Sequence, residues 1–445
     1  MKLRSNCLSS HRLRFFGTAL AAFSAAGVAR GQEGAARLPE LPSGFYEAAA
    51  TVIGEEETPS FGKLDFELGL LSRYDSNVTL GAPQGRFDEE SDFLIQPSLK
   101  SSFQLGSGSG EWRFGLKGEV TRMNFNELDR FNVTNYSFGL NGGYQSSRAK
   151  LLFDTAYAST GGVNRFVGSF FEQTSVSSRL TGDYTISPKT SFELSLRQNS
   201  VGSETQGFAD TSSTTFRVAA LWKATPLIRL GPGFRYGVRT AEVGLQDQEL
   251  TVAGPVLRLD YKLSTKVSLT SNIGLGFADT PSGDDELLNW RVGLNYRASS
   301  LWGLNLRMIR DTQATLFAGG GFDQVSSYRF GYTRKIRSAR LNLGVSYEDR
   351  APQGSTQVVT GFRDSGFLNY TASLGLPVFG DEVDLSLDLA WRDFDSADTL
   401  QSWNGLQSGL SLAWWLRWLR WLRWLRWLRP VWWRLWIRVL WELRF

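Results

Sequence analysis

Hydrophobic and polar residues alternate with a period of two along most of the chain between residues 62 and 414. In KLDFELGLL the even positions from Leu64 to Leu70 are apolar, and the positions between them are charged or glycine. The same alternation recurs in EWRFGLKGEV, LNWRVGLNY and VDLSLDLAW. Because successive side chains of a strand point to opposite faces, the pattern predicts strands that are apolar on one side only.

This pattern predicts about eighteen strands. They are expected at 62–75, 93–105, 111–125, 134–145, 149–158, 172–186, 190–199, 213–223, 227–240, 249–263, 267–278, 286–297, 301–310, 324–334, 339–349, 366–377, 382–393 and 402–414. No helical pattern separates them, so neighbouring strands are expected to pair as antiparallel hairpins.

Long and short connections alternate between these strands. The long ones are expected at 76–92, 126–133, 159–171, 200–212, 241–248, 279–285, 311–323, 350–365 and 394–401, and the short ones at 106–110, 146–148, 187–189, 224–226, 264–266, 298–300, 335–338 and 378–381. An even strand number with this alternation is typical of an all-β, transmembrane, antiparallel up-and-down β-barrel of about 18 strands. The short turns and both termini of the chain would then lie on the periplasmic side.

Aromatic residues favour this barrel over a soluble β-sandwich or solenoid. One set precedes or follows the short turns (Trp112, Tyr144, Tyr184, Trp222, Tyr296, Trp302 and Tyr332), and a second set lies near the long loops (Tyr74, Tyr157, Phe277, Tyr347 and Trp391). Two such bands are expected where a barrel crosses the two membrane interfaces. The opposite face of the strands is rich in Arg, Asp, Asn, Ser and Gly, which suits a watery lumen better than a second core.

The N-terminus predicts export. A basic stretch and the apolar run FFGTALAAFSAAGVA precede small residues at Ala29 and Gly31, so residues 1–31 are interpreted as a signal peptide cleaved before Gln32. An anchor helix is the alternative, but the run is shorter than the roughly 20 apolar residues that span a bilayer. Residues 32–61 are expected to form a periplasmic leader or linker, either flexible or plugging the barrel.

Cleavage would remove the only Cys and the only His of the chain, Cys7 and His11. Disulfides, thiolate or imidazole metal sites and Ser-His or Cys-His catalysis would then be excluded. A paired-carboxylate enzyme stays formally open, but no motif indicates one. The sequence therefore predicts no enzyme, no catalytic residue, no metal and no cofactor. The excess of basic over acidic residues lies at the two ends of the chain, so a nucleic-acid partner is not expected either.

Strand parity predicts which charged residues face the lumen. The candidate pore-lining residues are Arg217, Arg229, Arg235, Arg239, Arg258, Arg291, Arg307, Arg329, Arg340, Asp65, Glu67 and Glu119. Barrels of about 16–18 strands enclose an aqueous channel, and rings of Arg favour anions. A mildly anion-preferring pore and a mixed, ion-paired lumen without preference are both compatible with this set.

The segment RYDSNV at the end of the first predicted strand comprises Arg73, Tyr74, Asp75, Ser76, Asn77 and Val78. It resembles the start of the β-barrel porin 2 family of outer-membrane β-barrel proteins, some of which are linked to exopolysaccharide systems. Read from its residues alone, Tyr74 would be an interfacial aromatic and Asp75 to Asn77 would form a turn. A metal site that pairs Asp75 and Asn77 with the acids at 88–90 is a weaker alternative.

The predicted closing strand ends in Trp414, but 415–445 continue as a low-complexity Trp/Leu/Arg tail. Its three-residue repeat gives a helix no stable apolar face and would place an Arg on both faces of a strand. An expanded or frame-shifted repeat is the favoured interpretation. An interfacial peptide is an alternative, and so is a true closing strand ending at Phe445, because alternate residues from Val431 onward are apolar.

Together these features predict an outer-membrane porin-like channel for passive diffusion of small hydrophilic solutes. The alternatives are a component of an exopolysaccharide secretion or biosynthesis system and a sealed structural barrel. The expected location is the cell outer membrane of a Gram-negative cell. Expected partners are outer-membrane lipid, the barrel-assembly machinery and possible exopolysaccharide export proteins, while the oligomeric state stays open.

Overall fold

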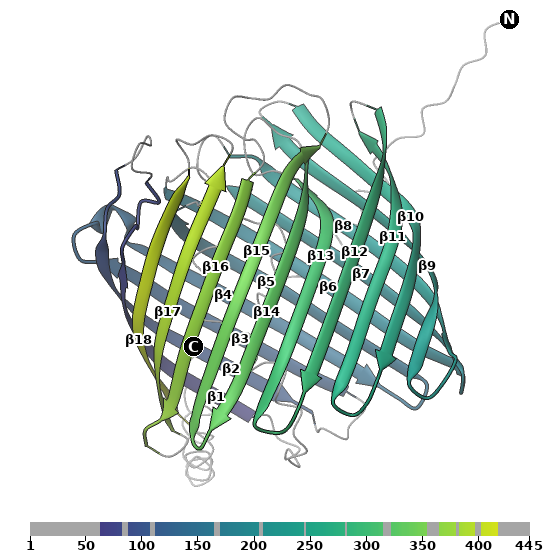
Figure 1. Ribbon diagram of the computed structural model, residues 1–445, viewed down its shortest axis with the longest axis horizontal. Helices are drawn as coiled ribbons and strands as arrows, with labels where there is room; N and C mark the ends of the chain where they lie inside the picture. The colour runs from purple at the N-terminus through teal and green to yellow at the C-terminus, as the bar shows by residue number, and fades with distance from the viewer. Residues whose placement is uncertain are drawn as a thin grey trace, which may run out of the picture.

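The computed structural model describes residues 63–81, 88–106, 112–163, 170–203, 208–243, 246–280, 283–314, 322–353, 365–379, 382–396 and 402–416. The predicted signal peptide and leader lie outside these residues, as does the tail after Leu416. The described part is a single barrel whose strands cross in front of and behind one another in Figure 1.

Eighteen strands form the wall of the barrel. They are β1 (Lys63–Asp75), β2 (Asp92–Leu105), β3 (Trp112–Phe125), β4 (Val133–Gln145), β5 (Ala149–Val163), β6 (Phe170–Ser187), β7 (Thr190–Ser203), β8 (Asp210–Lys223), β9 (Ile228–Val243), β10 (Gln246–Lys262), β11 (Val267–Thr280), β12 (Gly283–Arg297), β13 (Trp302–Ala314), β14 (Phe322–Ile336), β15 (Ala339–Gln353), β16 (Ser365–Pro377), β17 (Val383–Ser396) and β18 (Trp403–Leu416). One 3₁₀ turn, η1 (Asp129–Phe131), lies between β3 and β4. No helix among the described residues is long and apolar enough to cross a bilayer.

Pairing between the first and last strands closes the barrel. Each strand pairs antiparallel with the next one in sequence, and β18 pairs antiparallel with β1, with Phe66 opposite Leu416 and Asp75 opposite Gln407. The predicted closed, antiparallel, up-and-down barrel of 18 strands is confirmed. The closing strand runs two residues past Trp414.

The outer face of the wall is apolar, as the alternation predicts. On β1, Leu68 and Leu70 are 40% and 49% exposed, whereas Glu67, the residue before Leu68, is 6% exposed. On β17, Leu387 and Leu389 are likewise exposed. Since the strands turn every second side chain outward, the whole wall presents Leu, Val, Phe and Ile to its surroundings.

Aromatic rings meet across strands near both ends of the barrel. Near the short turns, the ring centroids of Trp112 and Tyr144 are 4.7 Å apart. Near the long loops, those of Tyr370 and Trp391 are 5.6 Å apart. Further cross-strand ring contacts join Tyr296 to Trp302, Trp302 to Tyr332, Tyr136 to Tyr157 and Tyr328 to Tyr347. Such pairs stabilise neighbouring strands and form two bands on the outer surface.

Two predicted long loops are wrong. β9 ends at Val243 and β10 begins at Gln246, and β11 ends at Thr280 three residues before β12 begins at Gly283. The predicted loops 241–248 and 279–285 belong largely to paired strands. Strand pairing continues there, with Gln248 opposite Ala241 and Asp279 opposite Asp284, although the sequence no longer alternates between apolar and polar residues.

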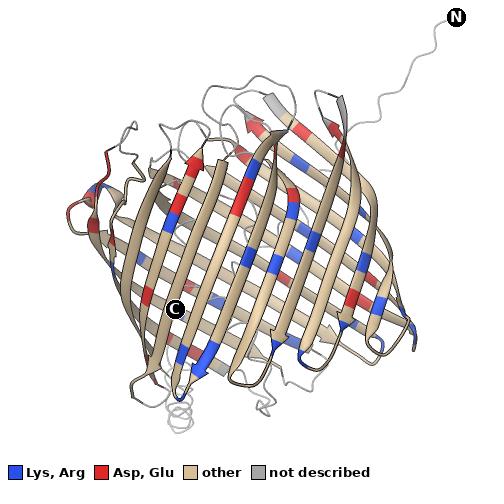
Figure 2. Ribbon diagram, viewed as in Figure 1, with Lys and Arg blue, Asp and Glu red and all other residues tan. Residues whose placement is uncertain are grey.

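Charge differs between the two ends of the barrel. Figure 2 shows basic residues gathered at the end with the short turns and acidic residues at the end with the long loops. The exposed bases at the short-turn end include Lys189, Lys223 and Lys335. The two rims therefore have opposite electrostatic character.

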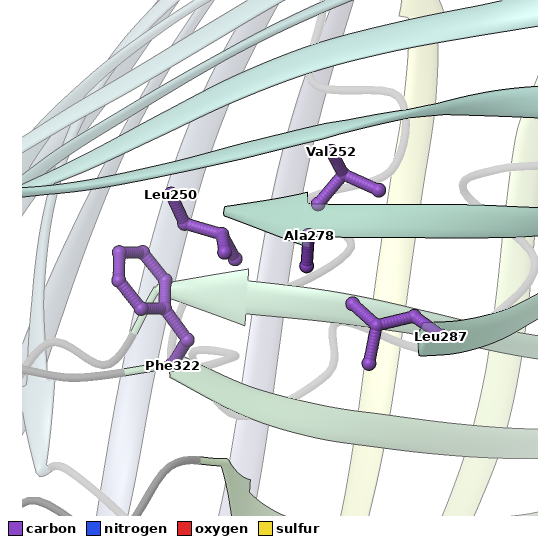
Figure 3. Packing of buried hydrophobic residues seen from close by; sticks show 5 residues of the cluster. All are labelled: Leu250, Val252, Ala278, Leu287 and Phe322. Carbon is purple, nitrogen blue, oxygen red and sulfur yellow. The ribbon is translucent and has the colours of Figure 1, made fainter. Parts of the chain in front are cut away.

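The end of the barrel with the long loops is partly filled by buried apolar residues. One cluster joins Leu250 and Val252 of β10, Ala278 of β11, Leu287 of β12 and Phe322 of β14 (Figure 3). Leu250 is 0% exposed. Four of these residues lie where β10, β11 and β12 approach the long-loop end, and Phe322 begins β14, so the cluster packs these strand ends against one another.

Candidate functional site

The inner face of the wall carries an arginine-rich cluster centred on Asp311 of β13. Both Asp311 carboxylate oxygens accept hydrogen bonds from Nη2 of Arg235, at 2.8 and 2.9 Å. Nη2 of Arg239 donates to the Oδ1 of the same carboxylate at 2.9 Å. The side chains of Arg235, Arg239 and Asp311 are 10%, 5% and 18% exposed. One carboxylate thus neutralises only part of the charge of two buried guanidinium groups.

The sheet bends sharply to make these contacts possible. Arg235 and Arg239 belong to β9 and Asp311 belongs to β13. Three strands lie between β9 and β13 in the wall, yet the backbones of β9 and β13 come within 8 Å of each other, Cα to Cα. Glycines permit this bend, since a Cβ at Gly231 would overlap the carbonyl oxygen of Ala220 and one at Gly254 that of Leu275. The approach brings β9 and β13 close together beside the cluster.

A cavity of ≈ 130 Å³ opens beside this cluster. It is lined by segments of β5, β6, β7, β8, β9, β12 and β13, and its charged lining residues are Asp154, Arg179, Arg197, Arg217, Arg235, Arg239, Arg291 and Asp311. Six of these residues are arginines and two are aspartates. Among the 22 lining residues only Val201 and Ala314 are apolar. The cavity is therefore polar with an excess of positive charge.

A second cluster of charges, nearer the short turns, is neutralised. Arg229 Nη1 donates to Asp183 at 2.9 Å and its Nη2 donates to Asp260 at 2.7 Å. Arg258 Nε donates to Asp260 at 3.0 Å, and its Nη1 lies 3.3 Å from Glu193. Three carboxylates surround two guanidinium groups, so these arginines are held in an ion-pair network instead of presenting excess positive charge.

The other pore-lining residues that strand parity predicts are spread over the inner face. Glu67 accepts a hydrogen bond from Lys100 at 2.8 Å, and Glu119 lies directly across from Lys100 on the next strand. Asp65 pairs with Ser102 on β2. Three further arginines complete the set: Arg307 and Arg329 form a cross-strand pair, and Arg340 is exposed beside the β14–β15 turn. Only Arg217, Arg235, Arg239 and Arg291 of the predicted set line the cavity.

The RYDSNV segment lies at the seam where the barrel closes. Asp75 accepts hydrogen bonds from Nη2 of Arg392, at 2.8 and 3.0 Å, and from Nε2 of Gln407, at 2.6 Å. Arg392 belongs to β17 and Gln407 to β18, so one carboxylate of β1 ties both strands. The guanidinium of Arg392 also lies 5.5 Å from the ring centroid of Trp403.

Asn77 fixes the chain that follows the seam. Its side-chain amide donates to the carbonyls of Gly81 and Asn404, both at 2.9 Å, and its Oδ1 accepts from the Gly81 backbone N–H at 2.9 Å. The predicted turn therefore exists, but its polar groups are occupied by protein. No group of His, Cys, Asp or Glu side chains suited to a metal ion occurs in the described ranges.

The segment 76–81 carries Leu80 into an apolar cluster at the end with the long loops. Leu80 packs with Val201 of β7, Phe394 of β17 and Trp403 of β18. β7 is separated from β17 and β18 by many strands in the pairing order, so this cluster joins opposite parts of the wall. Leu80 has φ 53°, a left-handed conformation that is unusual for a branched side chain and is maintained here by its surroundings.

The sequence pattern missed residues of the arginine-rich cluster around Asp311 and of the seam around Asp75. Asp311 was expected in the loop 311–323, but β13 continues to Ala314 and keeps Asp311 in register with Ile309 on the inner face. Arg392 and Gln407 share the inward parity of their strands, which was the available signal. Their proximity to Asp75 depends on closure of the barrel, which no local pattern contains.

No family model matches the chain, and no curated protein matches it. The resemblance to the β-barrel porin 2 family therefore stays a prediction.

Several solved structures are similar in strand arrangement. The siderophore receptor PirA from Pseudomonas aeruginosa is 8% identical, with 81% of each chain covered and a TM-score of 0.41. The FrpB iron transporter from Neisseria meningitidis is 10% identical, with 79% of this chain and 81% of that chain covered and a TM-score of 0.45. Pseudomonas aeruginosa OpdQ is 10% identical, with 80% and 97% covered and a TM-score of 0.41. Identities and TM-scores this low do not indicate a shared activity, so the proposals rest on the residues of this chain.

Proposed function

We propose that this protein is an outer-membrane channel through which small hydrophilic solutes diffuse passively. The observation that carries the proposal is a closed wall of eighteen strands with an apolar outer face and a charged inner face. A barrel exposes apolar residues on its whole outer surface when lipid is its solvent, and closure leaves no unpaired strand edge in the hydrocarbon. The two aromatic bands fit the two interfaces of a bilayer.

The inner face supports passage of polar solutes. Arg229 and Asp183 keep 34% and 31% of their side-chain surface exposed although they point into the barrel. Interior charges of this kind are stable because water reaches them, and a barrel of about 16–18 strands is wide enough to hold that water. The arginine-rich cluster beside the bend favours anions over cations at that part of the inner face.

A sealed structural barrel is the second candidate, and the apolar cluster around Leu80 favours it. That cluster joins β7 with β17 and β18 at the end with the long loops. It would narrow the lumen of a channel, or close the lumen of a sealed barrel. A role in exopolysaccharide export stays a prediction from the family resemblance.

Electrical recording from the purified, refolded protein in planar bilayers separates these candidates. A channel gives discrete conductance steps, and vesicles that contain it swell in isotonic solutions of small sugars. If the folded protein, recognised by its heat-modifiable gel mobility, gives no steps and no swelling, the channel proposal is wrong and the sealed barrel is retained.

A further inference from the structure

We propose that the cavity beside Asp311 is a binding site for a small hydroxylated anion that carries a carboxylate or phosphate group. This inference rests on the proposed function and deepens it, because it assigns a class of solute to one part of the inner face. Three observations carry it: the charge of the lining, the buried guanidinium nitrogens that lack acceptors, and the hydroxyl-rich, small volume of the cavity.

The first observation is the charge of the lining, with six arginines against two aspartates. Asp311 is shared by Arg235 and Arg239. No carboxylate of the described residues lies within ion-pair distance of Arg217, which also lines the cavity. A cavity with narrow walls focuses the field of a charge such as that of Arg217, and an anion is the species that lowers its energy there.

The second observation is that some guanidinium nitrogens of the lining arginines are buried and lack hydrogen-bond acceptors in the described part of the chain. Nε of Arg217, Nε of Arg235 and Nη1 of Arg239 are buried and have no acceptor among the described residues. The Nε atoms of four arginines outside the cavity lining share this property, so the Nη1 of Arg239 is the more specific indication; these four are Arg73, Arg310, Arg329 and Arg392. A buried donor without an acceptor is costly, and a carboxylate or phosphate oxygen supplies the strong, charge-assisted bond that it lacks.

The third observation concerns the rest of the lining and its size. Ser195, Asn199, Ser213 and Thr215 contribute hydroxyl and amide groups, which can bind the hydroxyls of a polyol. The cavity volume of ≈ 130 Å³ is small. A cavity of about 150 Å³ accommodates one benzene-sized molecule, so the fitting ligand has only a few carbon atoms.

The test is calorimetric titration of the refolded full chain in detergent at low salt. Glycerate and glycerol 3-phosphate are the anionic probes, and glycerol is the neutral probe of the same size. Both anions, or one of them, should bind while glycerol does not, and the affinity should fall as chloride is raised, because chloride competes for the same charges. Binding by only one anion identifies which acid group the site accepts.

Arg217→Gln is the diagnostic variant because it breaks no ion pair with a described residue, so the barrel should fold. It should weaken anion binding about tenfold or more, the usual effect of losing a charge-assisted hydrogen bond. Arg297→Gln is the matched control, since Arg297 is an exposed arginine at the far end of β12. The proposal is overturned if neither anion binds, if glycerol binds equally well, or if both variants weaken binding to the same extent.

Conductance measured on the same preparation distinguishes this inference from the proposed function. Conductance steps without anion binding would leave the channel in place and remove the site. Anion binding without conductance would retain the site and overturn the channel.

Discussion

Arg229 and Arg235 lie six residues apart on β9 and both point into the barrel, but their neighbours give them different roles. Arg229 is held between Asp183 and Asp260, so its charge is balanced. Arg235 shares Asp311 with Arg239 beside further arginines of the cavity. Solutes in the lumen would therefore encounter more excess positive charge beside Arg235 than beside Arg229.

Replacing Arg235, Arg291 and Arg329 together by Ser should lower the anion preference of the channel. All three lie on the inner face, where substitutions change selectivity more than membrane insertion. The measurement is the reversal potential in asymmetric salt, which should move toward the cation-selective side while the gel mobility of the folded barrel is kept. An unchanged reversal potential would contradict the assignment of these arginines to the pore.

Asp75→Asn should destabilise the barrel by about 3–5 kcal/mol, because it leaves the buried cation of Arg392 without its carboxylate. The two side chains of this pair are 8% and 11% exposed. Urea unfolding in lipid vesicles measures the free energy of unfolding.

The matched control for that substitution is Glu90→Gln. Glu90 and Arg130 also form an ion pair, but their side chains are 37% and 56% exposed. Water screens such a pair, so the expected loss is about 1 kcal/mol or less. Equal losses for the two variants would show that Asp75 has no special role at the seam.

At the scale of elements, each strand separates a lipid-facing from a lumen-facing set of side chains. Loops and strand ends then modify the lumen. Leu250, Val252, Ala278 and Leu287 of β10 to β12 pack in one apolar cluster, and Leu80 of the segment 76–81 packs in another. The strands set the width of the barrel, and these inward-packed segments set how much of that width is available.

Spin labels test the facing of the strands. The relaxation rate of nitroxide labels at Leu64, Phe114, Trp290 and Leu387 should rise with oxygen dissolved in lipid, because these residues share the outward parity of exposed neighbours. The relaxation rate of a label at Asp388, on the inner face, should rise instead with a water-soluble paramagnetic reagent. Water access at the first four positions would show that the strand register is wrong.

Leu80→Gly should raise the single-channel conductance, because it removes the side chain that joins opposite parts of the wall. The positive φ of Leu80 is one that glycine adopts at no steric cost, so the barrel should still fold. Leu406→Gly, on the outward face of β18, is the control and should leave conductance unchanged. If the Leu80 variant conducts like the parent, the segment 76–81 does not limit the pore.

At the scale of the whole molecule, the barrel is completed by one seam, and that seam uses residues from both ends of the described chain. Ten residue pairs join β1 to β18, from Phe66 opposite Leu416 to Asp75 opposite Gln407. The even strand number places the start of β1 and the end of β18 at the same rim, which is also the basic rim.

Truncation after Leu416 should therefore give a folded barrel, since every pair of the seam is retained. Heat-modifiable gel mobility and yield in the outer membrane are the measurements, and both should equal or exceed those of the full chain. Truncation after Leu410 is the control, because it removes the pairs nearest the short-turn rim and should abolish folding. If the first truncation also failed, a segment after Leu416 would be needed for assembly.

Sequence alone was sufficient for the fold because lipid on one side and water on the other impose alternation on each strand separately. Leu68, Glu67 and Leu70 reveal their faces without reference to any other strand, and so do the inward arginines of β9. The predicted ends of strands were less accurate. Beyond the apolar band, as between β9 and β10, hydrogen bonds extend the ladder with residues that carry no hydrophobic signal.

Tertiary structure alone decided which inner charges meet. Arg235 contacts Asp311 across three strands because the wall bends, Arg229 is neutralised by carboxylates of β6 and β10, and Asp75 meets Arg392 because the ends of the wall join. These contacts link residues far apart in sequence, and parity says only that each side chain points inward. Curvature and closure are properties of the complete sheet, so no local pattern could specify them.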